Sequence, residues 1–301
     1  MIIAVAATPS VAIPTLDALL KSEHVLDFVI TQPDRPAGRG RALSESEVSV
    51  WCRENGVTCH KPESSTQTQA LLTSLDVLIT IGYGVILAEE VFSTPRMGSL
   101  NLHFSLLPRW RGAAPVQRAI ESGDAISGVT VFALDRGMDT GPIYIQKRFA
   151  LDPDITSDAL LTELAQLGPE AIVESLDAMN TGVRPTPQDD SLSTRALKLS
   201  KDEAEIDWNQ SAEIIERKIR AFTSNPGAWT QFRGAILKID TPQLTQMKIP
   251  VGALRVIEKE LLVGTGTLAI SLGFLTPSGK GRMQALSWSH GARLTDEDHF
   301  G

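Results

Sequence analysis

The chain has 301 residues, of which 42% are hydrophobic, 21% charged and 5% aromatic. This composition is typical of globular proteins and excludes a disordered chain, and the length favours about two domains. The formal net charge of −8 excludes a basic surface over the whole molecule for nucleic acid. Residues 1–206 carry 17 Lys and Arg against 27 Asp and Glu, whereas residues 207–301 carry 11 against 9. A polyanion would therefore bind most readily to the C-terminal third of the chain or to a local basic loop.

The longest apolar run, 77–87, is interrupted by Thr80 and two glycines and is far shorter than the about 20 residues that span a bilayer. The N-terminus lacks a basic segment, so no secretory signal is expected. The two cysteines, Cys52 and Cys59, form no CxxC motif, and together with His60 they match no standard zinc site. We therefore expect a cytoplasmic protein with no membrane span, no disulfide framework and no metal.

Apolar segments alternate with helical patterns through the first two thirds of the chain. Strands are expected at 2–7, 25–31, 76–81, 99–104, 128–134 and 143–149. Helices are expected at 15–21, 45–55, 115–122 and 158–179. Ser157 is a candidate N-cap of the last helix, and Gly168–Pro169 should kink or split it. Apolar strands separated by helices indicate a mostly parallel α/β sheet.

The composition changes near residue 181, where Pro, Ser and Asp become frequent and no apolar period remains. We expect one domain over 1–187, a linker over 188–206 and a smaller domain over 207–301. The smaller domain should begin with an amphipathic helix, followed by closely spaced short strands that favour a small barrel or sandwich. The helix is expected at 212–222 and the strands at 229–232, 235–239, 252–258, 261–264 and 267–272.

The segment 99–120 carries the strongest chemical signal. On a strand that ends there, Asn101, His103 and Ser105 point to one face because side chains alternate. An amide beside an imidazole can bind a developing oxyanion and handle one proton. The same side chains could instead satisfy local backbone groups, but the irregular loop that follows lies where open α/β sheets bind ligands.

A second candidate element is the segment 128–143. Asp139 lies between Gly137 and Gly141, on a loop whose glycines permit close approach to a ligand. An acid there can orient His103 and stabilise its charged form. Asp135 competes for this role, and each acid also fits a turn-forming function, so spacing alone does not separate the two.

A basic loop at 33–42 carries Arg35, Arg39 and Arg41 among glycines and prolines. Arginine grips phosphate or stacks on bases, so this loop either contacts nucleic acid or is solvated surface. Trp110 is either exposed near an acceptor or a core anchor. A second candidate basic surface consists of C-terminal residues, namely Arg217, Lys218, Arg220, Arg233, Lys238, Lys248, Lys280 and Arg282.

These motifs together resemble the folate-dependent formyltransferases, and most closely those that act on methionyl-tRNA. The resemblance rests on N-x-H-x-S-L-L-P-x-x-R-G, matched from Asn101 to Gly112. It rests equally on D-x-G-x-D-T-G, matched from Asp135 to Gly141. Segments 31–43 and 198–208 and the closing 299–301 add to it.

The resemblance implies a Rossmann-like α/β formyltransferase domain and a smaller β-barrel domain of oligonucleotide-binding type. It implies transfer of the formyl group of 10-formyltetrahydrofolate to the α-amine of methionyl initiator tRNA, for translation initiation. Asn101, His103 and Asp139 would be the catalytic residues, and no metal, DNA or membrane would take part. Three arginines would contact tRNA, namely Arg35, Arg39 and Arg41. Seven residues would form the folate pocket, namely Ile81, Tyr83, Val85, Ser105, Leu106, Leu107 and Pro108.

Three rival functions stay open at this point. A transferase of the same fold that acts on a small amine, or a formyltetrahydrofolate hydrolase, would share the site but would not need the C-terminal domain and the arginine loop. A tRNA-binding module with a decayed site is disfavoured by the intact Asn101, His103 and Asp139. A nicotinamide-dependent dehydrogenase is disfavoured because no glycine fingerprint follows the first strand.

Overall fold

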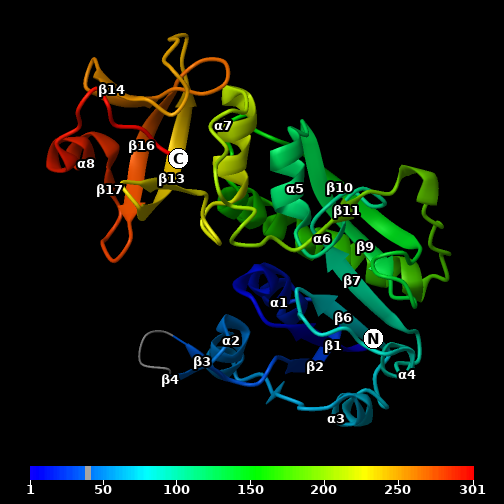
Figure 1. Cartoon of the computed structure of the whole chain (residues 1–301). Coiled ribbons are helices and arrows are strands. Elements are labelled where there is room, and N and C mark those ends of the chain that lie inside the picture. Colours follow the sequence, from blue (N-terminus) through cyan, green and yellow to red (C-terminus); the bar gives the residue numbers. More distant parts are fainter. Residues whose placement is uncertain (38–41) are drawn as a thin grey trace. The chain divides into compact units, whose positions relative to one another are not determined.

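The computed structural model of the chain describes residues 1–37 and 42–301 (Figure 1). Its internal contacts divide the chain into two units. The first unit contains Met1–Pro115, Ile126–Ala150 and Leu161–Ala196, and the second contains Val116–Ala125, Leu151–Leu160 and Leu197–Gly301. No helix within the described residues is both long enough and apolar enough to cross a membrane.

A seven-stranded sheet with the order β10-β9-β7-β6-β1-β2-β5 forms the first unit. Five strands run parallel, namely β1 (Ile2–Ala7), β2 (Val25–Ile30), β5 (Cys59–His60), β6 (Val77–Ile81) and β7 (Ser99–His103). The strands β9 (Ile126–Ala133) and β10 (Ile143–Ala150) pair antiparallel at one edge. The expected α/β sheet is therefore confirmed, with these two edge strands as its antiparallel part. Buried parallel strands such as β6 read as unbroken apolar runs because both of their faces are covered.

Helices and short strands complete this unit. The helices are α1 (Ile13–Leu20), α2 (Glu47–Asn55), α3 (Ser65–Leu71), α4 (Glu89–Phe92) and the larger part of α6 (Ser157–Asn180), with a 3-10 turn at Ser10–Ala12 and another at Asp190–Leu192. The short strands form two pairs, β3 (Arg35–Ala37) with β4 (Ala42–Ser44) and β8 (Arg111–Gly112) with β11 (Arg195–Ala196).

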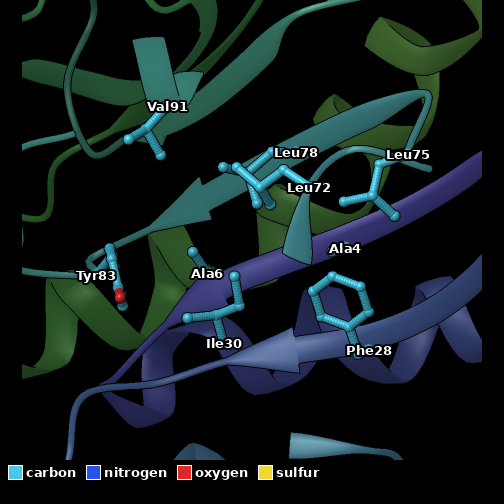
Figure 2. Packing of buried hydrophobic residues seen from close by; sticks show 9 residues of the cluster. All are labelled: Ala4, Ala6, Phe28, Ile30, Leu72, Leu75, Leu78, Tyr83 and Val91. Atoms are coloured by element: carbon cyan, nitrogen blue, oxygen red, sulfur yellow. The ribbon is translucent and has the colours of Figure 1, made fainter. Parts of the chain in front are cut away.

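A buried apolar cluster lies along β1, β2 and β6 and extends to the residues just beyond the end of β6 (Figure 2). Tyr83 lies two residues beyond β6 and belongs to this cluster, so the chain is fixed in place as it leaves the strand. Burial of these side chains is the dominant favourable contribution to folding. The cluster consists of Ala4, Ala6, Phe28, Ile30, Leu72, Leu75, Leu78, Tyr83 and Val91.

The long helix α6 differs from the expectation at two points. It continues through Pro169 without a split. A side chain at Gly168 would meet Thr15 Oγ1 at 2.6 Å, so this glycine permits close packing against a neighbouring element. At the start of the helix, Thr156 Oγ1 accepts from Ala159 N at 3.4 Å, whereas the Ser157 hydroxyl donates to the carbonyl of Thr223. Thr156 is therefore the N-cap rather than Ser157, because the Ser157 hydroxyl is hydrogen-bonded to the carbonyl of Thr223.

The second unit is an antiparallel β domain with helices. Its sheet follows the order β12-β13-β16-β15-β14, and β17 pairs with β16. Four aromatic residues pack against one another in this unit, with ring centroids of contacting pairs 4.9 to 6.1 Å apart, namely Trp208, Phe232, Trp288 and Phe300. The strands are β12 (Trp229–Phe232), β13 (Ala235–Leu244), β14 (Leu254–Ile257), β15 (Glu260–Val263), β16 (Ile270–Pro277) and β17 (Met283–Gln284). The helices are α7 (Ala212–Ala221), α8 (Ala285–Ala292) and most of α5 (Pro115–Ser122).

Candidate active site

Strands β6 and β7 bring Thr80 and Asn101 side by side, because their Cα atoms are partners in the parallel register. The Thr80 hydroxyl lies 2.7 Å from Asn101 Oδ1. The hydroxyl has one hydrogen and two acceptors in reach, Asn101 Oδ1 and, at 3.1 Å, the carbonyl oxygen of Leu100. The shorter distance favours the bond to the amide oxygen, which leaves Nδ2 as the open end of the amide. No hydrogen bond from Asn101 Nδ2 is found within the described residues. Asn101 therefore offers Nδ2 as a donor with a fixed direction.

His103 is the last residue of β7 and only 6% of its surface is exposed. Its Nε2 lies 2.9 Å from the carbonyl oxygen of Trp110. Because a carbonyl only accepts, Nε2 must carry a hydrogen, and a neutral His103 then has its lone pair on Nδ1. Nδ1 lies 3.6 Å from Asp139 Oδ2. A proton that arrives at Nδ1 would thus be held next to a carboxylate.

The two acids of the glycine-rich loop have different partners. Asp139 Oδ2 faces His103 and also accepts from Gly112 N at 2.7 Å. Asp135 Oδ1 instead accepts from Gly137 N at 3.0 Å and from Thr140 Oγ1 at 2.6 Å, which are bonds within its own loop. The competition that spacing left open is decided by this geometry: Asp139 reaches the imidazole and Asp135 shapes the turn.

The glycines of this loop serve tight packing. A side chain at Gly137 would overlap Thr140, and a side chain at Gly141 would overlap the carbonyl oxygen of Ala133. Asp139 itself has φ 56°, a left-handed conformation that is uncommon for residues other than glycine. The two glycines thus permit close contacts within the loop. Gly137 and Asp139 both line a cavity, so close approach of a ligand to this loop stays a prediction.

The segment that contains Gln188 holds the Asp139 loop and the loop that contains Arg111 in place. Gln188 Nε2 donates to the carbonyl oxygens of Asp139 at 2.9 Å and Gly141 at 2.7 Å, and its Oε1 accepts from Arg111 at 2.7 Å. Arg111 also pairs with Asp190 at 2.8 Å. The pairing of β8 with β11 adds a further connection between the same segments. Residues 188–196, expected to lie in a linker, therefore support the loops that carry the site.

A cavity of about 890 Å³ opens beside these groups within the first unit. Asn101, His103 and Asp139 all line it, as does Thr80. The remaining wall is largely apolar, and three of its side chains, Val85, Ile86 and Met138, are exposed at 47%, 85% and 61%. A large apolar cavity with a few converging polar groups is the usual form of a small-molecule site.

The seven residues expected to form a folate pocket are divided by the structure. Tyr83 and Val85 line the cavity. The other five are not among its lining residues, namely Ile81, Ser105, Leu106, Leu107 and Pro108. Strand β7 ends at His103, so the alternation that would have kept Ser105 on the same face stops first. The Ser105 hydroxyl donates to the carbonyl of Arg109 at 2.6 Å, which makes it part of the loop's internal structure.

Of the three loop arginines, Arg35 lies exposed on β3, and Arg39 and Arg41 lie outside the described residues. The eight basic residues of the C-terminal domain do not form one free surface. Arg233 pairs with Asp298 at 2.6 Å, Arg282 pairs with Asp240 at 2.8 Å, and Arg220 is buried against Glu216. Trp110 is half-buried, with the Arg109 guanidinium 4.4 Å from its ring centroid.

Comparison with known proteins decides the family. Residues 1–176 match the formyl transferase family, and residues 198–293 match the formyl transferase C-terminal domain. The chain is 42% identical to the methionyl-tRNA formyltransferase of Thermobifida fusca and 41% identical to that of Mycobacteroides abscessus. The alignments cover 98% of both chains in the first case and 99% of both in the second. The chain belongs to the methionyl-tRNA formyltransferase family.

Solved structures support the fold of this methionyl-tRNA formyltransferase family member. An N-formyltransferase from Helicobacter canadensis, solved with folinic acid and dTDP-3-aminofucose, matches with a TM-score of 0.68 at 20% identity. The match covers 90% of this chain and 98% of that one. A methionyl-tRNA formyltransferase from Clostridium thermocellum matches with a TM-score of 0.60 at 17% identity, over 83% of this chain and 96% of that one. At such identities the likeness concerns the fold alone.

Three participants in this formyltransferase site were not found from the sequence. Thr80 had a visible signal, since it is the one polar residue of the apolar strand Val77–Ile81. Gln188 had none, because it lies 49 residues from Asp139 in a segment without a pattern. The Trp110 carbonyl could not be found by residue type, because every residue carries that group.

Proposed function

We propose that the protein transfers the formyl group of 10-formyltetrahydrofolate to the α-amino group of methionyl initiator tRNA. The observation that carries this proposal is the meeting of Asn101, His103 and Asp139 on one large apolar cavity. The apolar wall suits the flat ring system of a folate, and the polar end suits a small carbonyl. We also propose that the protein acts in the cytoplasm, where both of its free thiols, Cys52 and Cys59, would stay reduced.

The proposed chemistry is attack of a neutral amine on the formyl carbon. A new N–C bond forms, the carbonyl oxygen becomes negative, and the bond to the folate nitrogen then breaks as that nitrogen takes a proton. Asn101 Nδ2 is the donor we assign to the oxyanion, because its amide oxygen is already engaged by Thr80. His103 Nδ1 accepts the amine proton, is then the second donor to the oxyanion, and passes this proton to the folate nitrogen as that nitrogen leaves.

Asp139 has an electrostatic role in this proposal. Its carboxylate, 3.6 Å from His103 Nδ1, stabilises the imidazolium that forms when the amine proton arrives. The Trp110 carbonyl keeps the other hydrogen on Nε2, so the proton can enter and leave only at Nδ1. The two bonds therefore restrict proton handling to the side of the ring that faces Asp139.

The acceptor is tested by comparing substrates. With a donor carrying a labelled formyl group, we expect fast transfer to methionyl initiator tRNA and slow transfer to free methionine or to amino sugars. Equal transfer to a small amine would favour the rival small-molecule transferase, and release of labelled formate without an acceptor would favour the hydrolase. Binding of the tRNA without any transfer would favour a module with a decayed site.

Thr80 provides a test of amide orientation. Thr80→Val keeps the shape of the side chain but leaves Asn101 Oδ1 without its donor, so kcat should fall by about tenfold, the value of one hydrogen bond. Thr80→Ser restores a hydroxyl and should restore kcat. A positioning role predicts a change in kcat with KM for the donor nearly unchanged. A change in KM alone, or no rescue by serine, would contradict this role.

Arg35 provides a test of phosphate binding. Arg35→Ala should weaken tRNA binding, and it should reduce the slope of log affinity against log salt concentration by about one for each phosphate that the arginine neutralises. Arg96→Ala is the matched control, because it removes the same charge from a guanidinium already paired with Asp76 at 2.8 Å. If both variants lower the slope equally, the effect is one of net charge and Arg35 does not bind a phosphate.

A further inference from the structure

A second group of chemically active side chains lies away from the cavity, in the first unit. His24 stands between α1 and β2 and is 8% exposed. Neither of its ring nitrogens has a hydrogen-bond partner, and both are closed to solvent. A buried imidazole without a partner is rare, because leaving its donor or acceptor unpaired costs free energy. His103, by comparison, has both nitrogens facing a partner.

Two carboxylates face this imidazole. One atom each of Glu23, His24 and Asp177 lies within 4.8 Å of the others. Glu23 comes from the same turn as His24, and Asp177 comes from α6. Both acids are exposed, and neither side chain makes a hydrogen bond or an ion pair with any other described residue. The cluster thus combines an imidazole nitrogen without a hydrogen-bond partner with two carboxylates that have no other partner, and each of the three can offer one ligand atom to a metal.

The local backbone holds His24 in position. The Ser22 hydroxyl donates to the carbonyl of Leu19 at 2.8 Å and accepts from the backbone N of His24 at 3.2 Å. The turn is therefore rigid where it presents the imidazole, whereas the two exposed carboxylates are free to rotate. Burial is the largest influence on His24 and lowers its pKa, which favours the neutral ring that a metal requires.

We propose that Glu23, His24 and Asp177 bind a divalent first-row transition-metal ion such as Zn²⁺, with water completing the coordination. One imidazole and two carboxylates form a mixed N/O donor set that suits such ions. Ligand atoms lie about 2.0 to 2.2 Å from zinc, so at tetrahedral angles two of them lie about 3.4 Å apart. Closing from as much as 4.8 Å therefore requires a shift of up to about 1.4 Å, which falls on the two exposed carboxylates. This proposal is independent of the proposed formyl transfer.

The same geometry has one competing explanation. A protonated His24 could form an ion pair with either acid after a small rotation, and no metal would then be needed. The two explanations differ in what they predict for the acids. If the cluster is a metal site, zinc binding depends on Asp177 and Glu23. If it is an ion pair, zinc does not bind specifically to these residues.

Zinc titration of the chelator-treated full chain, followed by calorimetry, tests the proposal. We expect one equivalent to bind and Mg²⁺, which prefers oxygen ligands, to bind far more weakly. Asp177→Asn and Glu23→Gln alter exposed side chains and should each weaken zinc binding by about tenfold or more. Two control variants should bind as the parent does: His290→Ala and Cys59→Ser.

Nitrogen NMR of the histidine rings gives a second readout that does not depend on a variant folding. Zinc should shift one ring nitrogen of His24 before those of the exposed His290. The proposal is overturned if the parent binds no zinc, if Asp177→Asn and Glu23→Gln bind it as tightly as the parent, or if Cys59→Ser abolishes binding. It is equally overturned if His24 carries both ring protons and stays unshifted by zinc.

Discussion

Asn101→Ala should fold normally and lose nearly all formyl transfer. Removing one donor to an oxyanion costs roughly 3–4 kcal/mol, which corresponds to a fall of a few hundredfold in kcat. The loss should be this large because Thr80 already holds the amide oxygen, so Nδ2 is oriented before the substrate arrives. Steady-state transfer to methionyl-tRNA measures the change.

Asn180→Ala is the control for this variant, because Asn180 is an exposed residue at the end of α6. Both variants should show the parent's circular dichroism and nearly the parent's melting temperature. If Asn101→Ala turned over nearly as fast as the parent, Asn101 would have no role in the reaction. A large fall in the melting temperature would mean instead that Asn101 has a structural role.

Asp139→Asn should reduce kcat by about a hundredfold or more, within the range expected when proton transfer is lost. The asparagine oxygen can still accept from Gly112 N, so the loop should keep its shape. What the substitution removes is the negative charge beside His103 Nδ1. The imidazolium is then stabilised less, and the amine proton is harder to accept.

Asp135→Asn is the matched control, since it makes the same change on the same loop and on the same cavity. An asparagine oxygen can accept from Gly137 N and Thr140 Oγ1 as the carboxylate does, so kcat should stay within about tenfold of the parent. Parallel kinetics of the two variants give the comparison. Asp135→Asn losing more activity than Asp139→Asn would reverse the roles assigned to the two acids.

Much of the first unit could be predicted because local pattern and tertiary structure agree there. Strands such as Ile2–Ala7 and Val77–Ile81 are buried on both faces, and burial of that kind selects unbroken apolar runs. Alternation along Ser99–His103 correctly placed Asn101 and His103 together. Helix α2 ends at Asn55, as expected, and Gly56 follows it with φ 68°, a conformation that glycine favours at a helix end.

The parts that could not be predicted depend on contacts between distant segments. The choice between Asp135 and Asp139 needed the path of the loop, since both acids have suitable chemistry. Gln188 joins two loops from a segment whose composition is that of a linker. The Thr80 contact depends on the register of β6 against β7, which no local pattern specifies.

The family resemblance predicted the fold class correctly, whereas the roles of the site residues stay predictions. Ser105 to Pro108 stay predicted folate contacts: they are not among the residues that line the cavity, and the Ser105 hydroxyl and Leu107 N both donate within the protein. Several basic residues of the C-terminal domain were expected to be free, and the structure pairs Arg233 and Arg282 with acids. Surface charge in the sequence is thus a poor guide to charge that is available to a partner.

The central claim is that Asn101, His103 and Asp139 surround the carbon that is transferred. A crystal structure of the protein with a stable formylfolate tests it most directly. We expect the formyl oxygen within about 2.7–3.1 Å of Asn101 Nδ2, with His103 and Asp139 beside the formyl carbon. A folate bound with its formyl group far from these side chains, or bound outside this cavity, would contradict the account.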